Sequence, residues 1–146
     1  MPFLAEASRI VAASPELVFD RLADHPSWRE WMPKSFFPVG PSEGPLKVGS
    51  RPRVRVAPMP TSTRLKVDVA ERGKELAWSG GNILLHAHHR FLFEPAEGNQ
   101  TRVRSVETWA GLLAPLMKGF VKPAAEKIGM EQLEGLARSL EKSPPR

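Results

Sequence analysis

Three of the four histidines of this sequence lie close together in an alternating segment at residues 83–94. In an extended strand, successive side chains point to opposite faces. His89 therefore shares a face with Phe91, and the apolar residues on that face mark it as the inner one. His86 and His88 share the outer face. They could chelate a surface ion, but His89 points the other way and no third ligand is evident, so we expect no metal site.

Glu107 is the carboxylate that a strand hairpin would place beside His89. A second alternating segment, residues 101–109, follows a short linker rich in turn-forming residues. If Phe93 pairs with Val103 in an antiparallel hairpin, the register places His89 opposite Glu107 on the inner face. A carboxylate and an imidazole held out of water either form an ion pair or share a proton.

This pair has two interpretations. In an apolar cavity, it could move protons on a substrate or anchor the polar group of a ligand. Alternatively, it is a structural pair that fixes the register of the sheet, or Glu107 lies in water at the open end of the sheet. The sequence has no glycine-rich phosphate loop and no nucleophile elbow. It also contains no cysteine and no tyrosine.

The longest helical pattern lies at the C-terminus, at residues 112–142. Its apolar residues recur three or four positions apart, with a slip at Gly129: Leu113, Leu116, Met117, Phe120, Val121, Ala124, Ile128, Leu133, Leu136, Ala137 and Leu140. A helix with an apolar face of about eight turns must be covered by other elements. The rest of the chain consists mainly of alternating segments, so we expect a curved sheet wrapped around this helix.

Two prolines bear on the shape of this helix. Pro115 lies in the first turn, where its missing N–H has little effect. Pro123 lies inside the helix and should remove one hydrogen bond and bend it. The bend is either a packing kink in a core helix or a feature that opens space between helix and sheet.

Ser14, Pro15 and Glu16 mark the start of a short helix that follows an N-terminal strand at residues 3–12. They supply a serine N-cap, a proline at the first helical position and an acid in the first turn. We expect its buried side to be formed by Leu17, Val18, Arg21 and Leu22, with Phe19 as a hydrophobic staple.

A second short helix is predicted at residues 27–31, with Trp28 and Trp31 on one side. The two tryptophans either fill the core or line a ligand pocket. Further strands are expected at residues 34–39, 50–57, 61–71 and 76–79.

The opening of the chain resembles the helix-grip superfamily, which is also called START-like or SRPBCC. The resemblance lies in the run Ile10–Asp20, in Leu22-Ala23-Asp24 and in Trp28-Arg29-Glu30-Trp31-Met32-Pro33, and extends more weakly over the whole chain. That superfamily includes polyketide cyclase/dehydrase-like proteins and pollen-allergen-like ligand binders. The pattern reflects packing and does not specify an activity.

The resemblance implies an α+β helix-grip fold, in which a curved antiparallel sheet of about six to seven strands wraps around the long C-terminal helix, with two short helices after the first strand. Residues 1–142 would form a single domain, and residues 143–146 a disordered tail. An apolar cavity between sheet and helix would hold a ligand, with Met59 at its rim. The residues expected to line it are Trp28, Trp31, Val54, Val56, Met59, Leu65, Val67, Trp78, Leu85, Phe91, Ser105, Trp109, Leu113, Met117 and Phe120.

Three functions from different classes fit this pattern. The first, which we favour, is the binding of a small hydrophobic molecule such as a lipid, with His89 and Glu107 as polar anchors. The second is a cyclase/dehydratase-type enzyme in which the same pair moves protons. The third is a protein-interaction module of the co-chaperone kind that uses an exposed rim. The sequence does not decide whether catalysis occurs, and no cofactor is implied.

The composition of the chain limits the classes of partner that we expect. The 146 residues include 21 basic and 16 acidic side chains, a net charge of +5. The arginines are scattered along strands without interleaved exposed aromatic residues, so we expect no nucleic-acid binding. No apolar run is long enough for membrane insertion, and no signal peptide is recognisable, so a cytoplasmic location is expected. Either a monomer or a homodimer is compatible with the sequence.

Overall fold

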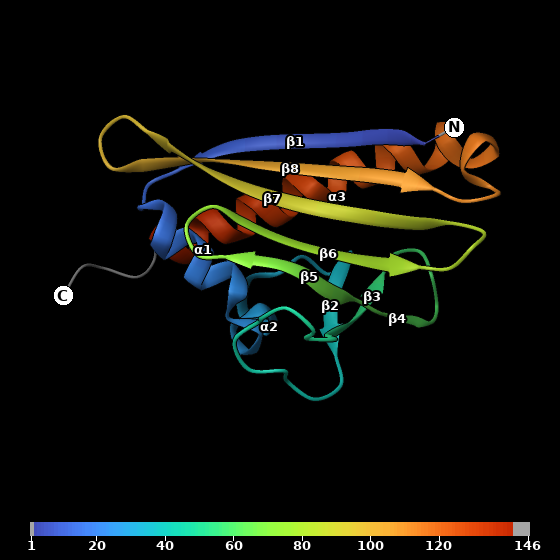
Figure 1. Ribbon diagram of the computed structural model, residues 1–146, viewed down its shortest axis with the longest axis horizontal. Coiled ribbons are helices and arrows are strands. Elements are labelled where there is room, and N and C mark those ends of the chain that lie inside the picture. The colour runs from blue at the N-terminus through green and yellow to red at the C-terminus, as the bar shows by residue number, and fades with distance from the viewer. Residues whose placement is uncertain (1, 142–146) are drawn as a thin grey trace.

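The computed structural model describes residues 2–141 and contains two antiparallel sheets and one long helix (Figure 1). The strands are β1 (Phe3–Val11), β2 (Phe36–Val39), β3 (Arg53–Val56), β4 (Ser62–Arg64), β5 (Lys66–Glu71), β6 (Glu75–Gly81), β7 (His86–Ala96) and β8 (Gln100–Ala110). The helices are α1 (Pro15–Ala23), the 3-10 turn η1 (His25–Ser27), α2 (Trp28–Trp31) and α3 (Ala114–Glu141). Lys142 and the predicted tail at residues 143–146 lie outside the described residues.

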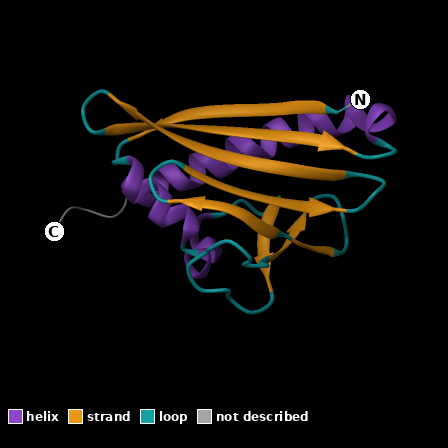
Figure 2. Cartoon of the chain, in the orientation of Figure 1, coloured by secondary structure: helices purple, strands orange, loops and turns teal. Residues whose placement is uncertain are grey.

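The main sheet has five strands in the order β1-β8-β7-β6-β5, and the small sheet has three in the order β2-β3-β4. In Figures 1 and 2, α3 runs along one face of the main sheet, behind β1, β8 and β7. The predicted α+β architecture, with short helices after the first strand and a long C-terminal helix, is confirmed. None of the helices in residues 2–141 combines the length and apolar character needed to cross a bilayer.

The hairpin of β7 and β8 has the predicted register. Phe93 pairs with Val103, and His89 pairs with Glu107. The inner-face residues Phe91 and Phe93 are buried in the core. Because the strand alternates, the outer face of β7 carries the polar residues, as the sequence predicts.

The number of strands differs from the prediction because the segment 61–71 is not one strand. The chain leaves the small sheet at Leu65 and enters the main sheet as β5, so β4 and β5 belong to different sheets. The N–H of Leu65 donates to the carbonyl of Pro52, and its side chain is buried. A bulge between Val67 and Val69 then shifts the register. After the bulge, Val69 is only half-buried, whereas Val67 is fully buried.

Helix α1 begins as predicted, because the Ser14 hydroxyl accepts a hydrogen bond from the N–H of Leu17 at 3.3 Å. Its buried face was placed wrongly by one position. Leu17 is exposed, whereas Phe19 is buried and packs edge-on against Phe93. Residues three or four positions apart lie on the same face of a helix, so the buried face is formed by positions 18, 19, 22 and 23.

Helix α3 is continuous through Pro123 from Ala114 to Glu141. The predicted slip at Gly129 does not occur, because Gly129 itself lies on the buried face: a Cβ there would lie 3.4 Å from the Ser105 hydroxyl oxygen. The predicted apolar stripe is wrong near its start, where Leu116 and Phe120 are exposed. At about 100° per residue these two lie on the opposite side of the helix from the buried face.

Two glycines of α3 provide a matched test of how α2 packs on it. A Cβ at Gly135 would collide with the backbone carbonyl oxygen of Trp31, whereas a Cβ at Gly119 would meet nothing within 4 Å. We expect Gly119→Ala to stabilise the protein by about 0.5–1 kcal/mol, because alanine favours the helix. Gly135→Ala should destabilise it by about 1–3 kcal/mol through overpacking. Urea denaturation of both variants measures the difference, and equal stabilities would contradict the close contact between α2 and α3.

Candidate functional site

The predicted pair lies on the inner face of the main sheet, where β7 supplies His89 and β8 supplies Ser105 and Glu107. His89 Nε2 lies 2.7 Å from the hydroxyl oxygen of Ser105. On the other side of the ring, His89 Nδ1 lies 3.5 Å from Glu107 Oε2. The side chain of His89 is 4 % exposed and that of Glu107 is 13 % exposed. Both nitrogens of the imidazole therefore face polar groups inside the protein.

Aromatic rings surround His89 and explain its isolation from water. The ring of Phe91 stacks on the imidazole with centroids 4.1 Å apart, and Trp78 meets it edge-on at 5.5 Å. Trp78 in turn contacts Trp28 at 5.3 Å. Gly129 of α3 approaches Ser105 from the helix side. The imidazole is thus surrounded by aromatic rings of the sheet, with Trp28 of α2 packed behind Trp78 and α3 next to Ser105.

Burial sets the protonation states of the two groups. It lowers the pKa of His89 to about 3, with a smaller effect from the charge of His88. Burial also raises the pKa of Glu107 to about 8. Near neutral pH the imidazole is therefore uncharged and the carboxyl carries a proton.

A neutral imidazole has one donor and one acceptor nitrogen. With a protonated Glu107 beside Nδ1, the consistent arrangement has Nδ1 as acceptor and Nε2–H donating to the Ser105 hydroxyl. The 3.5 Å separation between Nδ1 and Glu107 Oε2 is too long for a strong hydrogen bond. The carboxyl of Glu107 consequently keeps hydrogen-bonding capacity for another molecule.

The outer face of β7 carries ordinary surface pairs. His88 Nε2 lies 3.2 Å from Asp68, and Arg90 forms a bidentate pair with Glu75. Among residues 2–141, no three histidine, cysteine, aspartate or glutamate side chains are arranged to hold a metal ion.

Apart from Ser105, which contacts His89, the residues predicted to line a cavity fall into three groups in the structure. Most belong to the main core, where they contact one another: Trp28, Trp31, Val54, Val56, Leu65, Val67, Trp78 and Phe91. A smaller cluster near the start of α3 contains Leu85, Trp109 and Met117, together with Phe3 and Val121. The third group, Met59, Leu113 and Phe120, is exposed.

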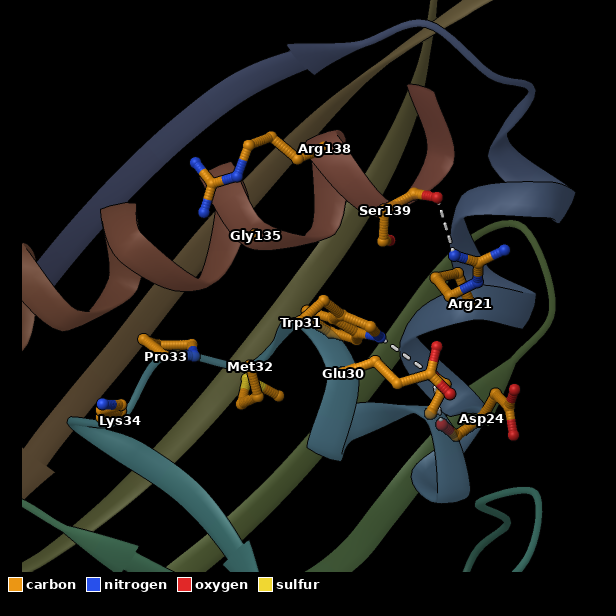
Figure 3. A pocket seen from close by; sticks show the side chains of 11 residues that line it. Arg21, Asp24, Glu30, Trp31, Met32, Pro33, Lys34, Gly135, Arg138 and Ser139 are labelled. Atoms are coloured by element: carbon orange, nitrogen blue, oxygen red, sulfur yellow. Dashed lines mark hydrogen bonds between the residues drawn. The ribbon is translucent and has the colours of Figure 1, made fainter. Parts of the chain in front are cut away.

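Two open pockets lie away from the pair. A cleft of about 630 Å³ lies between α1, α2 and the C-terminal part of α3, with Trp31 and Arg138 on its walls (Figure 3). The indole N–H of Trp31 donates to the Ser27 hydroxyl there. A shallower pocket of about 370 Å³ lies beside His86 and His88. His89 and Glu107 line neither of these two pockets.

Sequence reasoning missed one buried polar group on α3. Gln132 is 1 % exposed, and within the described part of the chain its side-chain nitrogen and oxygen have no hydrogen-bond partner. The indole N–H of Trp109 is also buried without a partner there. The sequence could have indicated Gln132, because this polar residue lies between Gly129 and Leu136 on the apolar face of the helix.

The profile of the family "Polyketide cyclase / dehydrase and lipid transport" matches residues 2–141. The chain belongs to this family. The predicted membership of the helix-grip superfamily is thereby confirmed, and the packing of the main sheet on α3 agrees with it.

Several solved structures share the fold. A hypothetical protein, jhp0584, from Helicobacter pylori is 19 % identical with a TM-score of 0.77, over 94 % of this chain and 87 % of that one. Norcoclaurine synthase from Thalictrum flavum, solved with dopamine and hydroxybenzaldehyde, is 9 % identical with a TM-score of 0.77, over 100 % and 90 %. The Zhui aromatase/cyclase from Streptomyces sp. R1128 is 16 % identical with a TM-score of 0.74, over 97 % and 95 %. No curated protein sequence matches the chain. At these identities the structural likeness shows the fold alone.

The two opposed pKa shifts make the stability of the protein depend on pH. Between pH 4.5, the ordinary pKa of Glu107, and pH 8, the folded state holds a proton that the unfolded chain has released. Stability therefore falls as pH rises through this window. Below pH 6.5, the ordinary pKa of His89, the imidazole has the opposite effect, because only the unfolded chain binds its proton. The net fall is expected between pH 6.5 and 8.

Glu107→Gln should remove this fall, because the amide does not ionise. Relative to the variant, the wild type should lose up to about 1.4 kcal/mol of unfolding free energy per pH unit in that range. Denaturant titrations at several pH values measure it. Glu97→Gln, in the exposed turn between β7 and β8, is the control. A wild type and a Glu107→Gln variant with parallel profiles would contradict the buried, protonated carboxyl.

Proposed function

We propose that this protein binds a small, largely hydrophobic molecule that carries an oxygen function, between the inner face of the main sheet and α3. His89 and Glu107 are its polar anchors. The observation that supports this most directly is the buried, uncharged His89–Glu107 pair, whose imidazole is surrounded by aromatic rings. Family membership and the cyclase-like solved structures favour the same class of function.

The chemistry of the pair defines the ligand. Glu107 is protonated near neutral pH, so it donates a hydrogen bond to a carbonyl or hydroxyl oxygen. An anionic ligand group would be held poorly, because a charge brought beside Trp78 and Phe91 loses its hydration. The surrounding rings favour a flat or aliphatic apolar body.

Two further polar groups are consistent with a ligand that has more than one oxygen. Buried polar atoms are almost always hydrogen-bonded, and unpartnered ones call for a ligand or water. The amide of Gln132 and the indole N–H of Trp109 meet this description within the described residues. Gln132 belongs to α3, which packs on the inner face of the sheet, and Trp109 lies on β8 two residues after Glu107, on the same face of that strand. A plain hydrocarbon would leave all of these groups unsatisfied.

Binding can be tested with a matched pair of probes, an aromatic hydroxyketone and the hydrocarbon of the same ring skeleton. We expect the hydroxyketone to raise the melting temperature, since a ligand at about 100 times its Kd stabilises the folded state by about 2.7 kcal/mol. Glu107→Gln should weaken the binding of the hydroxyketone by about tenfold, because the carboxyl O–H that donates a hydrogen bond to the ligand oxygen is replaced by an amide. Affinity for the hydrocarbon should change little.

His88→Ala is the control for this experiment, because it changes the neighbouring residue on the opposite face of β7. It should leave both affinities unchanged. The proposal would be rejected if neither probe binds, or if His88→Ala weakens the hydroxyketone as much as Glu107→Gln does.

A cyclase/dehydratase activity is the second candidate, and the value near 8 for the pKa of Glu107 favours it. A general acid works best when its pKa lies near the working pH, and Glu107 meets this condition. His89, with a pKa of about 3, is a weak base at neutral pH. If the protein is an enzyme, Glu107 donates the proton to the substrate oxygen and His89 positions that carboxyl.

Turnover can be separated from binding with a diketone probe that cyclises with loss of water, followed by mass spectrometry. If the protein is an enzyme, Glu107→Gln should lower kcat by about 10²–10⁴-fold while the Kd for the probe changes by about tenfold or less. If the wild-type protein binds the probe but water is lost only at the uncatalysed rate, the hypothesis of an enzyme is rejected. Ligand binding would then remain as the function.

A further inference from the structure

The shallow pocket of about 370 Å³ beside His86 and His88 is surrounded by basic side chains. Arg64, at the end of β4, and Lys66, at the start of β5, line it on the side opposite the two histidines. Among the described residues 2–141, no aspartate or glutamate lines this pocket. We call it the basic pocket. In Figure 1 it lies where β4 meets the ends of β5 and β6.

The basic pocket is hollow because its middle strand carries small residues. Lys66 pairs with Ser79, and Ser79 pairs with His88, so these three residues form one row across β5, β6 and β7. In the next row Gly81 pairs with His86. The φ of Gly81 is +111°, and a Cβ there would collide with the backbone just after the turn, so no larger residue fits. Neighbouring strands are about 4.8 Å apart, which leaves about 10 Å between the backbones of β5 and β7.

Like charges are held close together at one wall of the pocket. Arg53 on β3 lies directly opposite Arg64 on β4 in the register of the small sheet. Side chains that face each other in an antiparallel pair are neighbours, and two like charges placed there repel. Arg53 Nη1 donates to the Ser62 hydroxyl oxygen at 3.2 Å, which does not neutralise its charge. Within the described residues, Arg53, Arg64 and Lys66 form no ion pair.

The segment that builds this wall holds the excess positive charge of the protein. Residues 44–67 contain no aspartate or glutamate, whereas the rest of the chain has 15 basic and 16 acidic residues. The next acidic residue, Asp68, lies 3.2 Å from His88 Nε2 and does not line the pocket. The positive charge beside the pocket is therefore uncompensated within the segment. Its six basic residues are Lys47, Arg51, Arg53, Arg55, Arg64 and Lys66.

We propose that the basic pocket binds the phosphate group of a small soluble molecule. Arg64 and Lys66 donate charge-assisted hydrogen bonds to the phosphate oxygens from one wall. His86 and His88 form the opposite wall, and a histidine beside an anion takes up a proton more readily. A doubly charged phosphate matches several cations better than a single carboxylate does. It also relieves the repulsion between Arg53 and Arg64.

The lining distinguishes this ligand from larger polyanions. Apart from the two histidines, no aromatic side chain of the described residues lines the pocket, so nucleic-acid bases have no ring on which to stack. Its largest apolar lining residue is Ala87, which is too small to enter a membrane. The proposal is independent of the hydrophobic ligand site, because His88 and His89 project from opposite faces of β7.

Calorimetric titration of the full chain with inorganic diphosphate tests the proposal. The protein should bind diphosphate at physiological ionic strength and should bind acetate at least tenfold more weakly. Arg64→Gln and Lys66→Gln should each weaken diphosphate binding by about tenfold, because each removes a charge-assisted hydrogen bond. Ser79→Val should weaken it to a similar degree without a change of charge, because the added methyl groups fill the space over β6. Valine is a good strand residue, so this variant should fold.

Arg102→Gln is the matched control, because it removes the same charge from an exposed position on β8, outside the pocket. It should bind diphosphate like the wild type, and melting temperatures show whether each variant is folded. The proposal is overturned if the wild type does not bind diphosphate, or if Arg102→Gln weakens binding as much as Arg64→Gln does. It is also overturned if folded Ser79→Val binds like the wild type, or if single-stranded RNA or anionic vesicles bind where diphosphate does not.

Discussion

The pairing of β7 with β8 is the constraint on which the site depends. Eleven residue pairs, from His86↔Ala110 to Ala96↔Gln100, join these central strands. Since side chains alternate between faces, a slip of one residue would send His89 to the solvent and bring His88 into the core. The aromatic residues Phe91 and Phe93 on the same face oppose such a slip, because it would expose them as well. The packing that stabilises the sheet and the placement of the polar pair therefore have one cause.

Burial then determines what the pair can do. An imidazole and a carboxyl in water would form an ion pair near neutral pH, but loss of hydration shifts both toward their uncharged forms. The result is a donor and an acceptor without net charge, which suits neutral oxygen-containing molecules better than ionic ones. Ser105 fixes the orientation of the ring through its contact with His89 Nε2.

The sequence was most informative where a pattern depends on neighbouring residues. The register of β7 and β8 and the N-cap at Ser14 could be predicted, because alternation and capping are local. Local alternation contains no information about where a chain moves from one sheet to another, so the change at Leu65 and the bulge before Val69 were missed. Helical periodicity also gave a wrong prediction of burial at Leu116, because that part of α3 is apolar on two sides. The lining of a cavity depends on packing between distant segments, and its prediction from sequence remains untested.

The bulge in β5 has a consequence for how the molecule behaves in a crowded solution. β5 is an outer strand of the main sheet, and its outer side is partly covered, because the N–H of Val67 donates to the carbonyl of Ser50 and the carbonyl of Val67 accepts from the N–H of Gly49. The extra residue at Asp68 interrupts the even spacing that a new strand would need, and Lys66 and Asp68 place charges along the same border. Growth of the sheet by addition of strands from other molecules is thereby disfavoured. The bulge at Asp68 and the backbone hydrogen bonds from Gly49 and Ser50 together leave little of this edge available to a strand from another molecule.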